Sequence, residues 1–217
     1  MSGLQGIFFD FDGVLADTEP MHWRCWAEVL APDGVTLTWD FYRQYCVGLD
    51  DREMLRVAGA HLQPPRDGSA LWQRYPAKRE LFRARMLAAP PIDPALDKVL
   101  DALHRRYRLA VVSSSACAEI EPLIEAAGIR RHFDTVVGAG DVEHRKPAPD
   151  PYLLAAKRLG VTSAIVVEDS EAGLASGRAA GFEVLAIDCV SNLIPILERR
   201  LGGMPRASIL TKCTIDT

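Results

Sequence analysis

Three short apolar runs, each ending in a polar residue, most constrain how this chain can fold. They occupy residues 6–10 (GIFFD), 109–113 (LAVVS) and 164–168 (AIVVE). Each run is too short for a typical helix and has no polar residue before its last position, as expected of a strand buried on both faces. Buried strands of this kind belong to parallel sheets that helices cover on both sides.

Helical patterns lie between the later runs. Apolar residues recur at the i, i+3, i+4, i+7 spacing in two segments: Leu96, Val99, Leu100, Leu103 and Ile120, Leu123, Ile124, Ala127. Gly128, Gly160 and Gly181 follow helical stretches, where a left-handed residue commonly ends a helix. From residue 95 onward the order helix–strand repeats up to a last strand at 183–187. This order predicts an α/β fold with a Rossmann-like parallel sheet flanked by helices, to which the strand at 6–11 also belongs.

Residues 17–88 break this alternation. They are rich in helix formers and aromatic residues, and they contain no convincing strand. Three prolines within residues 88–94 then favour a linker. We therefore expect an α/β core domain made of residues 1–16 and 89–217, with an all-helical domain, residues 17–88, inserted into it.

Charge and hydropathy argue against several classes of protein. The net charge of −4 over 217 residues gives no long-range attraction for nucleic acid. No apolar stretch reaches the roughly 18 to 20 residues needed to cross a bilayer. The N-terminal sequence MSGLQGIFFDFDG lacks the features of a signal peptide. We expect a cytoplasmic monomer that binds neither nucleic acid nor membranes.

The five cysteines are odd in number, widely spaced and form no C-x-x-C pair. They are Cys25, Cys46, Cys117, Cys189 and Cys213. This spacing indicates neither a disulfide framework nor a zinc site, so we expect reduced thiols that serve mainly in packing.

Acidic residues end two of the predicted strands. Asp10 and Asp12 follow the first strand, where a period of two places both carboxylates on one side. Glu168 and Asp169 end the strand at 164–168. The carboxyl ends of parallel strands form the usual ligand crevice, and a cluster of carboxylates there suits Mg2+ when a phosphate completes the coordination. Alternatively, Glu168 and Asp169 cap the following helix.

Two further polar residues fit a phosphate site. Ser113 ends the second run and can donate its hydroxyl, together with the Ser114 amide, to a phosphoryl oxygen. The alternative is helix capping, with Ser114 or Ser115 as the cap of the helix through Ile124. Lys146 lies between residues 144 and 150 (HRKPAPD), where prolines favour an extended approach to a helix that begins near residue 150. A fixed ammonium there would offset the acidic cluster.

Four segments together resemble the motifs of haloacid dehalogenase-like phosphotransferases. They are residues 10–18 (DFDGVLADT), 111–113 (VVS), 146–147 (KP) and 167–170 (VEDS), in the same order and at similar spacing. The resemblance covers nearly the whole chain. Residues 17–88 resemble the helical cap of the group that contains phosphoglycolate phosphatase and β-phosphoglucomutase.

The resemblance implies a mechanism. Asp10 would attack phosphorus and become an aspartyl phosphate, and Asp12 would protonate the leaving oxygen and then deprotonate water. Asp10, the backbone carbonyl of Asp12 and Asp169 would hold Mg2+, with Glu168 fixing the site from the metal's second shell. Ser113 and Lys146 would hold phosphoryl oxygens. The expected enzyme is a Mg-dependent phosphoric monoester hydrolase that acts on a small phosphorylated metabolite such as a sugar phosphate.

The alternative is a mutase of the β-phosphoglucomutase type. His22 and Lys78 stand where that group has a histidine and a cap lysine, which makes both candidate substrate-binding residues. Asp51 aligns with the mutase's substrate-binding arginine, and the neighbouring Arg52 is the candidate here. A packing role for His22 and a solvated position for Arg52 or Lys78 are the other readings. A phospho-accepting receiver or binding protein is a third class, which multiple turnover of a phosphate ester would exclude.

Overall fold

The computed structural model describes residues 3–202 and divides the chain into two compact units. The core unit is formed by the segments up to Asp17 and from Pro90 onward, and the helical unit is Thr18–Ala89. The boundaries expected from the sequence, after residues 16 and 88, each lie one residue earlier.

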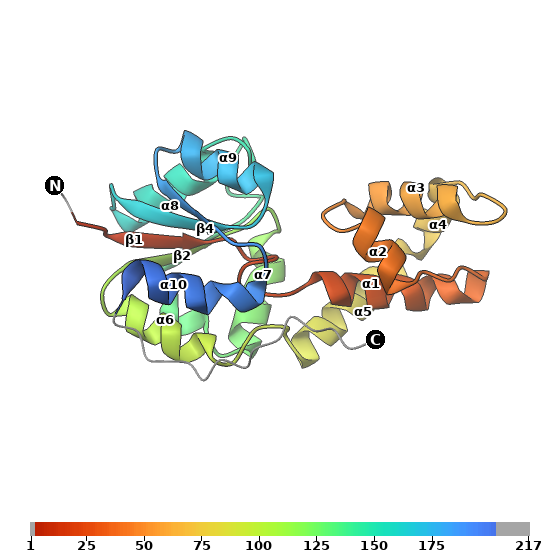
Figure 1. The fold of residues 1–217 in the computed structure, drawn as a ribbon, viewed down its shortest axis with the longest axis horizontal. Coiled ribbons are helices and arrows are strands. Elements are labelled where there is room, and N and C mark those ends of the chain that lie inside the picture. The colour runs from red at the N-terminus through yellow and green to blue at the C-terminus, as the bar shows by residue number, and fades with distance from the viewer. Residues whose placement is uncertain (1–2, 203–217) are drawn as a thin grey trace. The chain divides into compact units, whose positions relative to one another are not determined.

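The core unit contains a five-stranded sheet in which every neighbouring pair of strands is parallel (Figure 1). The strands are β1 (Gly6–Phe9), β2 (Arg108–Val112), β3 (Thr135–Val137), β4 (Ala164–Glu168) and β5 (Glu183–Ala186). Their order across the sheet is β3-β2-β1-β4-β5. The Rossmann-like parallel sheet predicted from the apolar runs is therefore confirmed.

Helices cover both faces of this sheet. They are α6 (Leu96–His104), α7 (Cys117–Ala126), α8 (Asp150–Leu159), α9 (Glu171–Ala179) and α10 (Leu193–Leu201), with short 3-10 turns at Arg130–His132 and Val190–Asn192. In Figure 1, α8 and α9 lie on one face and α6 and α10 on the other. The burial of both faces explains why the strands read as continuous apolar runs.

Side chains from alternate strand positions form the core beneath α8. Phe8 of β1, Val112 of β2 and Val166 of β4 are fully buried and pack with Tyr152 and Ala155 of α8. This packing fixes α8 against the centre of the sheet. It also carries one polar group inward, the Tyr152 hydroxyl.

Two local expectations need correction or completion. The strand that must lie between α7 and α8 is β3, whose three residues, 135–137, are too few to show a periodic pattern. Helix α7 is not capped by Ser114 or Ser115, because its N-cap is Ala116, which makes no side-chain cap bond. The backbone of Ser115 is instead bonded within the loop before the helix.

The helical unit consists of helices and short 3-10 turns, and residues 18–89 contain no strand. The helices are α1 (Glu19–Leu30), α2 (Trp39–Tyr45), α3 (Asp51–His61), α4 (Gly68–Leu71) and α5 (Tyr75–Ala88), and the turns are Ala31–Asp33 and Trp72–Arg74. Helix α1 packs against α5. Trp26, Leu30, Tyr42 and Leu55 are buried in a common apolar cluster. The unit therefore has a hydrophobic core of its own.

Cys25, Cys46, Cys117 and Cys189 are free thiols, and Cys213 lies outside the described residues. Among residues 3–202, none of the helices combines the length and the apolar character that crossing a membrane requires.

Candidate active site

The central position of β1 brings the predicted strand-end residues together. Phe9 is in register with Val111 of β2 and with Val167 of β4. The Asp10 N–H continues the β4 pairing by donating to the Val167 carbonyl oxygen at 3.0 Å. From β1 the chain runs through β2 to β3 at one edge of the sheet, and after crossing over it runs from β4 to β5 at the other edge. The direction of winding therefore reverses between β1 and β4, which is where open α/β sheets form their ligand crevice.

The turn after β1 depends on Gly13. This residue has φ +77, a left-handed conformation that favours glycine. A Cβ built on Gly13 would lie 2.0 Å from Asp169 Oδ2, so the Asp169 side chain rests against the turn itself. Glycine therefore permits both the reversal of the chain and the close approach of an acidic side chain from the end of β4.

Lys146 lies at the centre of the core site. Its ammonium Nζ donates to Asp10 Oδ1 at 2.5 Å, to Glu168 Oε1 at 2.5 Å and to the Val112 carbonyl oxygen at 2.9 Å. Its side chain is 4% exposed. Burial alone lowers the pKa of this ammonium, but the carboxylates of Asp10 and Glu168 hold it above its ordinary value. Lys146 therefore stays charged and joins the ends of β1, β2 and β4.

Glu168 is held by donors on both of its carboxylate oxygens. Oε1 accepts from Lys146 and from the Tyr152 hydroxyl at 2.8 Å. Oε2 accepts from the Asp169 N–H at 3.1 Å, the Ser170 N–H at 3.2 Å and the Ser170 hydroxyl at 3.1 Å. Both oxygens of this fully buried side chain are therefore hydrogen-bonded. Its oxygens are already used to fix Lys146, so direct ligation of a cation would require exchange of these bonds.

The acidic cluster has the donor set of a hard cation. Oxygens of Asp10, Glu168 and Asp169 lie within 4.8 Å of one another. Burial raises the pKa of Asp10 to about 8; Lys146 opposes this shift, and Glu168 and Asp12 add to it. Burial and the Glu168 carboxylate raise the pKa of Asp169 to about 6. This crowding of negative charge, with oxygen donors alone in the cluster, fits a divalent cation such as Mg2+.

Asp12 and Ser113 lie beside this cluster on the loops after β1 and β2. Asp12 Oδ2 accepts a hydrogen bond from the Ser115 hydroxyl at 3.3 Å. Ser113 is 4% exposed, and its Oγ accepts from the Ser115 N–H at 3.0 Å. The Ser113 proton can still be donated to another oxygen. Ser114, which lies between Ser113 and Ser115 in the sequence, is exposed.

Within the helical unit, Lys78 and His22 come together around Asp51. Lys78 is 2% exposed, and its ammonium donates to Asp51 Oδ1 at 2.8 Å, to Asp51 Oδ2 at 3.0 Å and to His22 Nδ1 at 2.8 Å. Asp51 also accepts from the indole N–H of Trp26 at 2.7 Å. Burial and the neighbouring ammonium lower the pKa of His22 to about 4. Because an ammonium can only donate, His22 is neutral and carries its proton on Nε2.

Arg52 does not join this group. It is exposed, and its guanidinium stacks over the Trp72 ring at 4.0 Å from the centroid. The Arg52 guanidinium thus contacts an aromatic face of the helical unit.

Two residues that sequence reasoning missed are Tyr152 and Ser115, each of which bonds directly to a predicted site residue. Tyr152 follows the KPAPD segment on an apolar helix face and looks like an ordinary core residue in the sequence. Ser115 belongs to a run of three serines, which signals polar loop chemistry but does not say which partner each hydroxyl takes.

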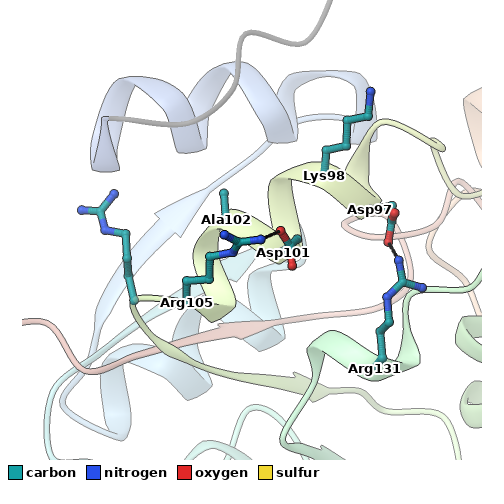
Figure 2. Close-up of a pocket in the computed structure, with 7 residues that line it drawn as sticks. Asp97, Lys98, Asp101, Ala102, Arg105 and Arg131 are labelled. Carbon is teal, nitrogen blue, oxygen red and sulfur yellow. Dashed lines mark hydrogen bonds and ion pairs between the residues drawn. The ribbon is translucent and has the colours of Figure 1, made fainter.

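A separate pocket lies along α6 (Figure 2). Its lining residues are Asp97, Lys98, Asp101, Ala102, Arg105, Arg106 and Arg131. Arg105 pairs with Asp101 at 2.7 Å, and Arg131 pairs with Asp97. These pairs neutralise part of its positive charge, and none of the predicted site residues lines it.

Comparison with known proteins places residues 7–187 within the family described as haloacid dehalogenase-like hydrolase. The fructose-1-phosphate phosphatase YqaB of Escherichia coli (strain K12) is 37% identical over 187 residues, which cover 84% of this chain and 95% of that protein. The phosphorylated carbohydrates phosphatase of Thermotoga maritima is 29% identical over 183 residues, 83% of each chain.

The fold also matches a solved structure. A protein from Thermotoga maritima that was proposed to be a β-phosphoglucomutase superposes with a TM-score of 0.73 at 24% identity. The match covers 91% of this chain and 100% of that one. At this identity the likeness establishes the shared fold.

The raised pKa of Asp10 predicts how the stability of the metal-free protein depends on pH. Between the ordinary value of 3.8 and about 8, the folded protein holds a proton that the unfolded chain releases, so stability is lost as pH rises through this window. Asp10→Asn removes this dependence. In EDTA, the Tm of Asp10→Asn minus that of the wild type should therefore increase from about pH 5 to about pH 8.

Thermal denaturation at both pH values measures this difference, with about 2–4 °C expected per kcal/mol in a protein of this size. Added Mg2+ should raise the wild-type Tm more at the higher pH, because the cation competes with the proton for the same oxygens. A difference between the two proteins that is independent of pH would contradict the account.

Proposed function

Because the chain belongs to the haloacid dehalogenase-like hydrolases, we propose that it is a phosphatase for small sugar phosphates that works through an aspartyl phosphate at Asp10. The observation that carries this proposal is the buried carboxylate of Asp10 at the end of β1, held 2.5 Å from the Lys146 ammonium, with a second acid, Asp12, two residues later. A nucleophilic carboxylate needs a fixed orientation, and the ammonium offsets the negative charge that an incoming phosphate adds.

The proposed reaction has two steps. Asp10 attacks phosphorus as the ester P–O bond breaks, and Asp12 gives its proton to the departing sugar oxygen. Asp12, now a carboxylate, takes a proton from water as that water attacks phosphorus, and the bond between Asp10 and phosphorus breaks. Inorganic phosphate leaves, and Asp10 and Asp12 return to their starting states. Ser113 and Lys146 hold the equatorial phosphoryl oxygens during both displacements.

Magnesium is the proposed cofactor. Asp10, Asp169 and the Asp12 backbone carbonyl would hold it. Glu168 would orient these groups through its hydrogen bonds with Lys146 and the Asp169 N–H. When bound, Mg2+ supplies positive charge that reduces repulsion between the carboxylates and the phosphate. The oxygen-only donor set and the raised pKa values of Asp10 and Asp169 support this assignment.

Two relatives support hydrolysis of sugar phosphates over transfer within a sugar. Both the Escherichia coli and the Thermotoga maritima relatives are named as phosphatases of phosphorylated carbohydrates. The mutase reading has a chemical difficulty within the helical unit. A mutase handles a bisphosphate, but the Asp51 carboxylate already neutralises Lys78. We therefore rank the phosphatase first, and the mutase becomes an outcome of the test.

The helical unit is proposed to act as a cap that recognises the substrate while the core unit supplies the chemistry. His22 and Lys78 are its proposed recognition residues, with Ser114 contributing from the core unit. The neutral Nε2–H of His22 suits a sugar hydroxyl or ring oxygen, because it donates without adding charge. Lys78 can meet a substrate oxygen directly only by exchanging one of its bonds to Asp51 or His22.

A screen of sugar monophosphates tests the proposed function. With Mg2+ present, we expect release of inorganic phosphate over many turnovers from at least one ketose or aldose phosphate, and no release by Asp10→Asn, whose amide cannot attack phosphorus. β-Glucose 1-phosphate with a catalytic amount of bisphosphate is assayed in parallel. Conversion to the 6-phosphate without phosphate release would favour the mutase, and absence of any turnover would refute both readings.

Lys78→Ala tests the recognition role of the helical unit. We expect a fall in kcat/KM for the best sugar phosphate with little change for p-nitrophenyl phosphate, because the small aryl ester does not use the recognition contacts. Lys157→Ala on the exposed face of α8 is the matched control. Lys78 is buried, so the Tm of each variant is measured alongside the kinetics. Equal losses on both substrates would assign Lys78 to folding or to the chemical step instead.

A further inference from the structure

We propose that Ser115 is a positioning residue that orients the carboxyl group of Asp12 for proton transfer. This inference rests on the proposed function, in which Asp12 is the general acid and base. It adds to the proton-transfer step a residue of the loop between β2 and α7.

The contact itself is a hydrogen bond from the Ser115 hydroxyl to Asp12 Oδ2, at 3.3 Å. Both residues are partly buried, so the bond lies at the edge of the site where a substrate can still reach Asp12. The residues are 103 positions apart in the chain, and only the pairing of β1 with β2 brings them together. The bond therefore exists because of the fold and not because of local sequence.

The Ser115 backbone is fixed on both sides, which is what makes its hydroxyl a defined donor. Its N–H donates to Ser113 Oγ at 3.0 Å, and its carbonyl oxygen accepts from the Ala139 N–H at 3.0 Å. Gly138 closes over the same segment. A Cβ at Gly138 would lie 2.9 Å from the Ser115 carbonyl oxygen and 2.6 Å from the Cys117 nitrogen. The loop after β3 thus clamps the loop after β2.

Further contacts through Asp141 hold the loop after β3 in this position. Asp141 Oδ2 accepts from the Gly138 N–H at 2.9 Å and from the Cys117 thiol at 3.2 Å. Arg158 of α8 pairs with Asp141 Oδ1 at 3.2 Å. These contacts tie the position of Ser115 to the core unit through α8. A side chain supported in this way keeps its orientation at lower entropic cost than a free loop serine.

Helix capping does not account for the Ser115 hydroxyl. A serine before a helix usually accepts from an N–H of the first turn. Here the N-cap of α7 is Ala116, and the Ser115 hydroxyl donates to Asp12. The side chain thus takes part in the arrangement of the site rather than in helix formation.

The bond assigns different roles to the two oxygens of Asp12. Oδ2 accepts a hydrogen bond from the Ser115 hydroxyl, so the transferable proton resides on Oδ1. Oδ1 gives this proton to the departing oxygen and later receives one from water. Without the Ser115 donor, Oδ2 loses this hydrogen bond, and fewer bound complexes have Oδ1 aligned with the leaving oxygen. The loss should be greatest when the leaving group needs protonation most.

Leaving-group dependence tests the proposal. For Ser115→Ala we expect kcat to fall roughly tenfold with a sugar phosphate, whose alkoxide is a poor leaving group, and to change little with p-nitrophenyl phosphate. Ser115→Thr keeps the hydroxyl and should recover most of the activity. Ser163→Ala, at the opposite end of the strands just before β4, is the matched control. Equal losses on both substrates, or a Thr variant as impaired as Ala, would overturn the proposal.

A double-mutant cycle separates this inference from the proposed function. In an Asp12→Ala background, Ser115→Ala should cause no further loss, because its effect acts through Asp12. If Asp12→Ala impairs the sugar phosphate and Ser115→Ala does not, only the positioning role fails. If Asp12→Ala itself has no effect, the acid–base assignment fails and the positioning role fails with it. Losses that simply add would also refute the positioning role.

Gly138→Ala gives an independent check through the clamp. The added Cβ must displace the Ser115 carbonyl or the Cys117 backbone. We expect the same selective loss on the sugar phosphate as for Ser115→Ala. A Gly138→Ala enzyme with the wild-type ratio of the two substrates would contradict the proposal.

Discussion

The core site depends on one buried ammonium among several carboxylates. The Lys146 ammonium donates hydrogen bonds to both Asp10 and Glu168, and it donates a third hydrogen bond to the Val112 carbonyl oxygen. Separating these charges inside the protein would leave uncompensated carboxylates, whose desolvation is costly. The ends of β1, β2 and β4 are therefore held together by electrostatics as well as by sheet pairing. The orientation of the Asp10 carboxyl group is set by these contacts alone.

The surrounding residues serve this arrangement in distinct ways. Tyr152 reaches from α8 to Glu168, so the packing of that helix against the sheet also fixes the acid behind Lys146. Gly13 lets the Asp169 side chain approach the turn after β1. The site still holds more carboxyl groups than the single Lys146 ammonium can balance, and the raised pKa values of Asp10 and Asp169 reflect this together with burial. A cation and a phosphate dianion would together satisfy it better than either alone.

Much of the core could be predicted from sequence because its signals are local. The apolar runs at 6–10 and 164–168 specified buried strands, and their terminal acids specified where the site would lie. The position of β3 could not be predicted, because three residues are too few to show a periodic pattern of apolar side chains. For Ser115 the sequence offered only the alternative of a helix cap, shared with Ser114, because a bond between side chains 103 residues apart leaves no sign in the spacing of residues. The saturation of Lys78 by Asp51 and His22 also depends on helix packing, which a sequence pattern does not reveal.

Trapping a phosphorylated form of the enzyme would show whether Asp10 is the nucleophile. The enzyme is mixed with Mg2+ and an excess of the best sugar phosphate, quenched in acid during turnover, digested and analysed by mass spectrometry. We expect one phosphoryl group on the peptide that contains Asp10 and Asp12, with fragmentation assigning it to Asp10. We expect none on the Asp10→Asn protein. A phosphoryl group on another residue, or an Asp10→Asn enzyme that turns over normally, would show that Asp10 is not the nucleophile.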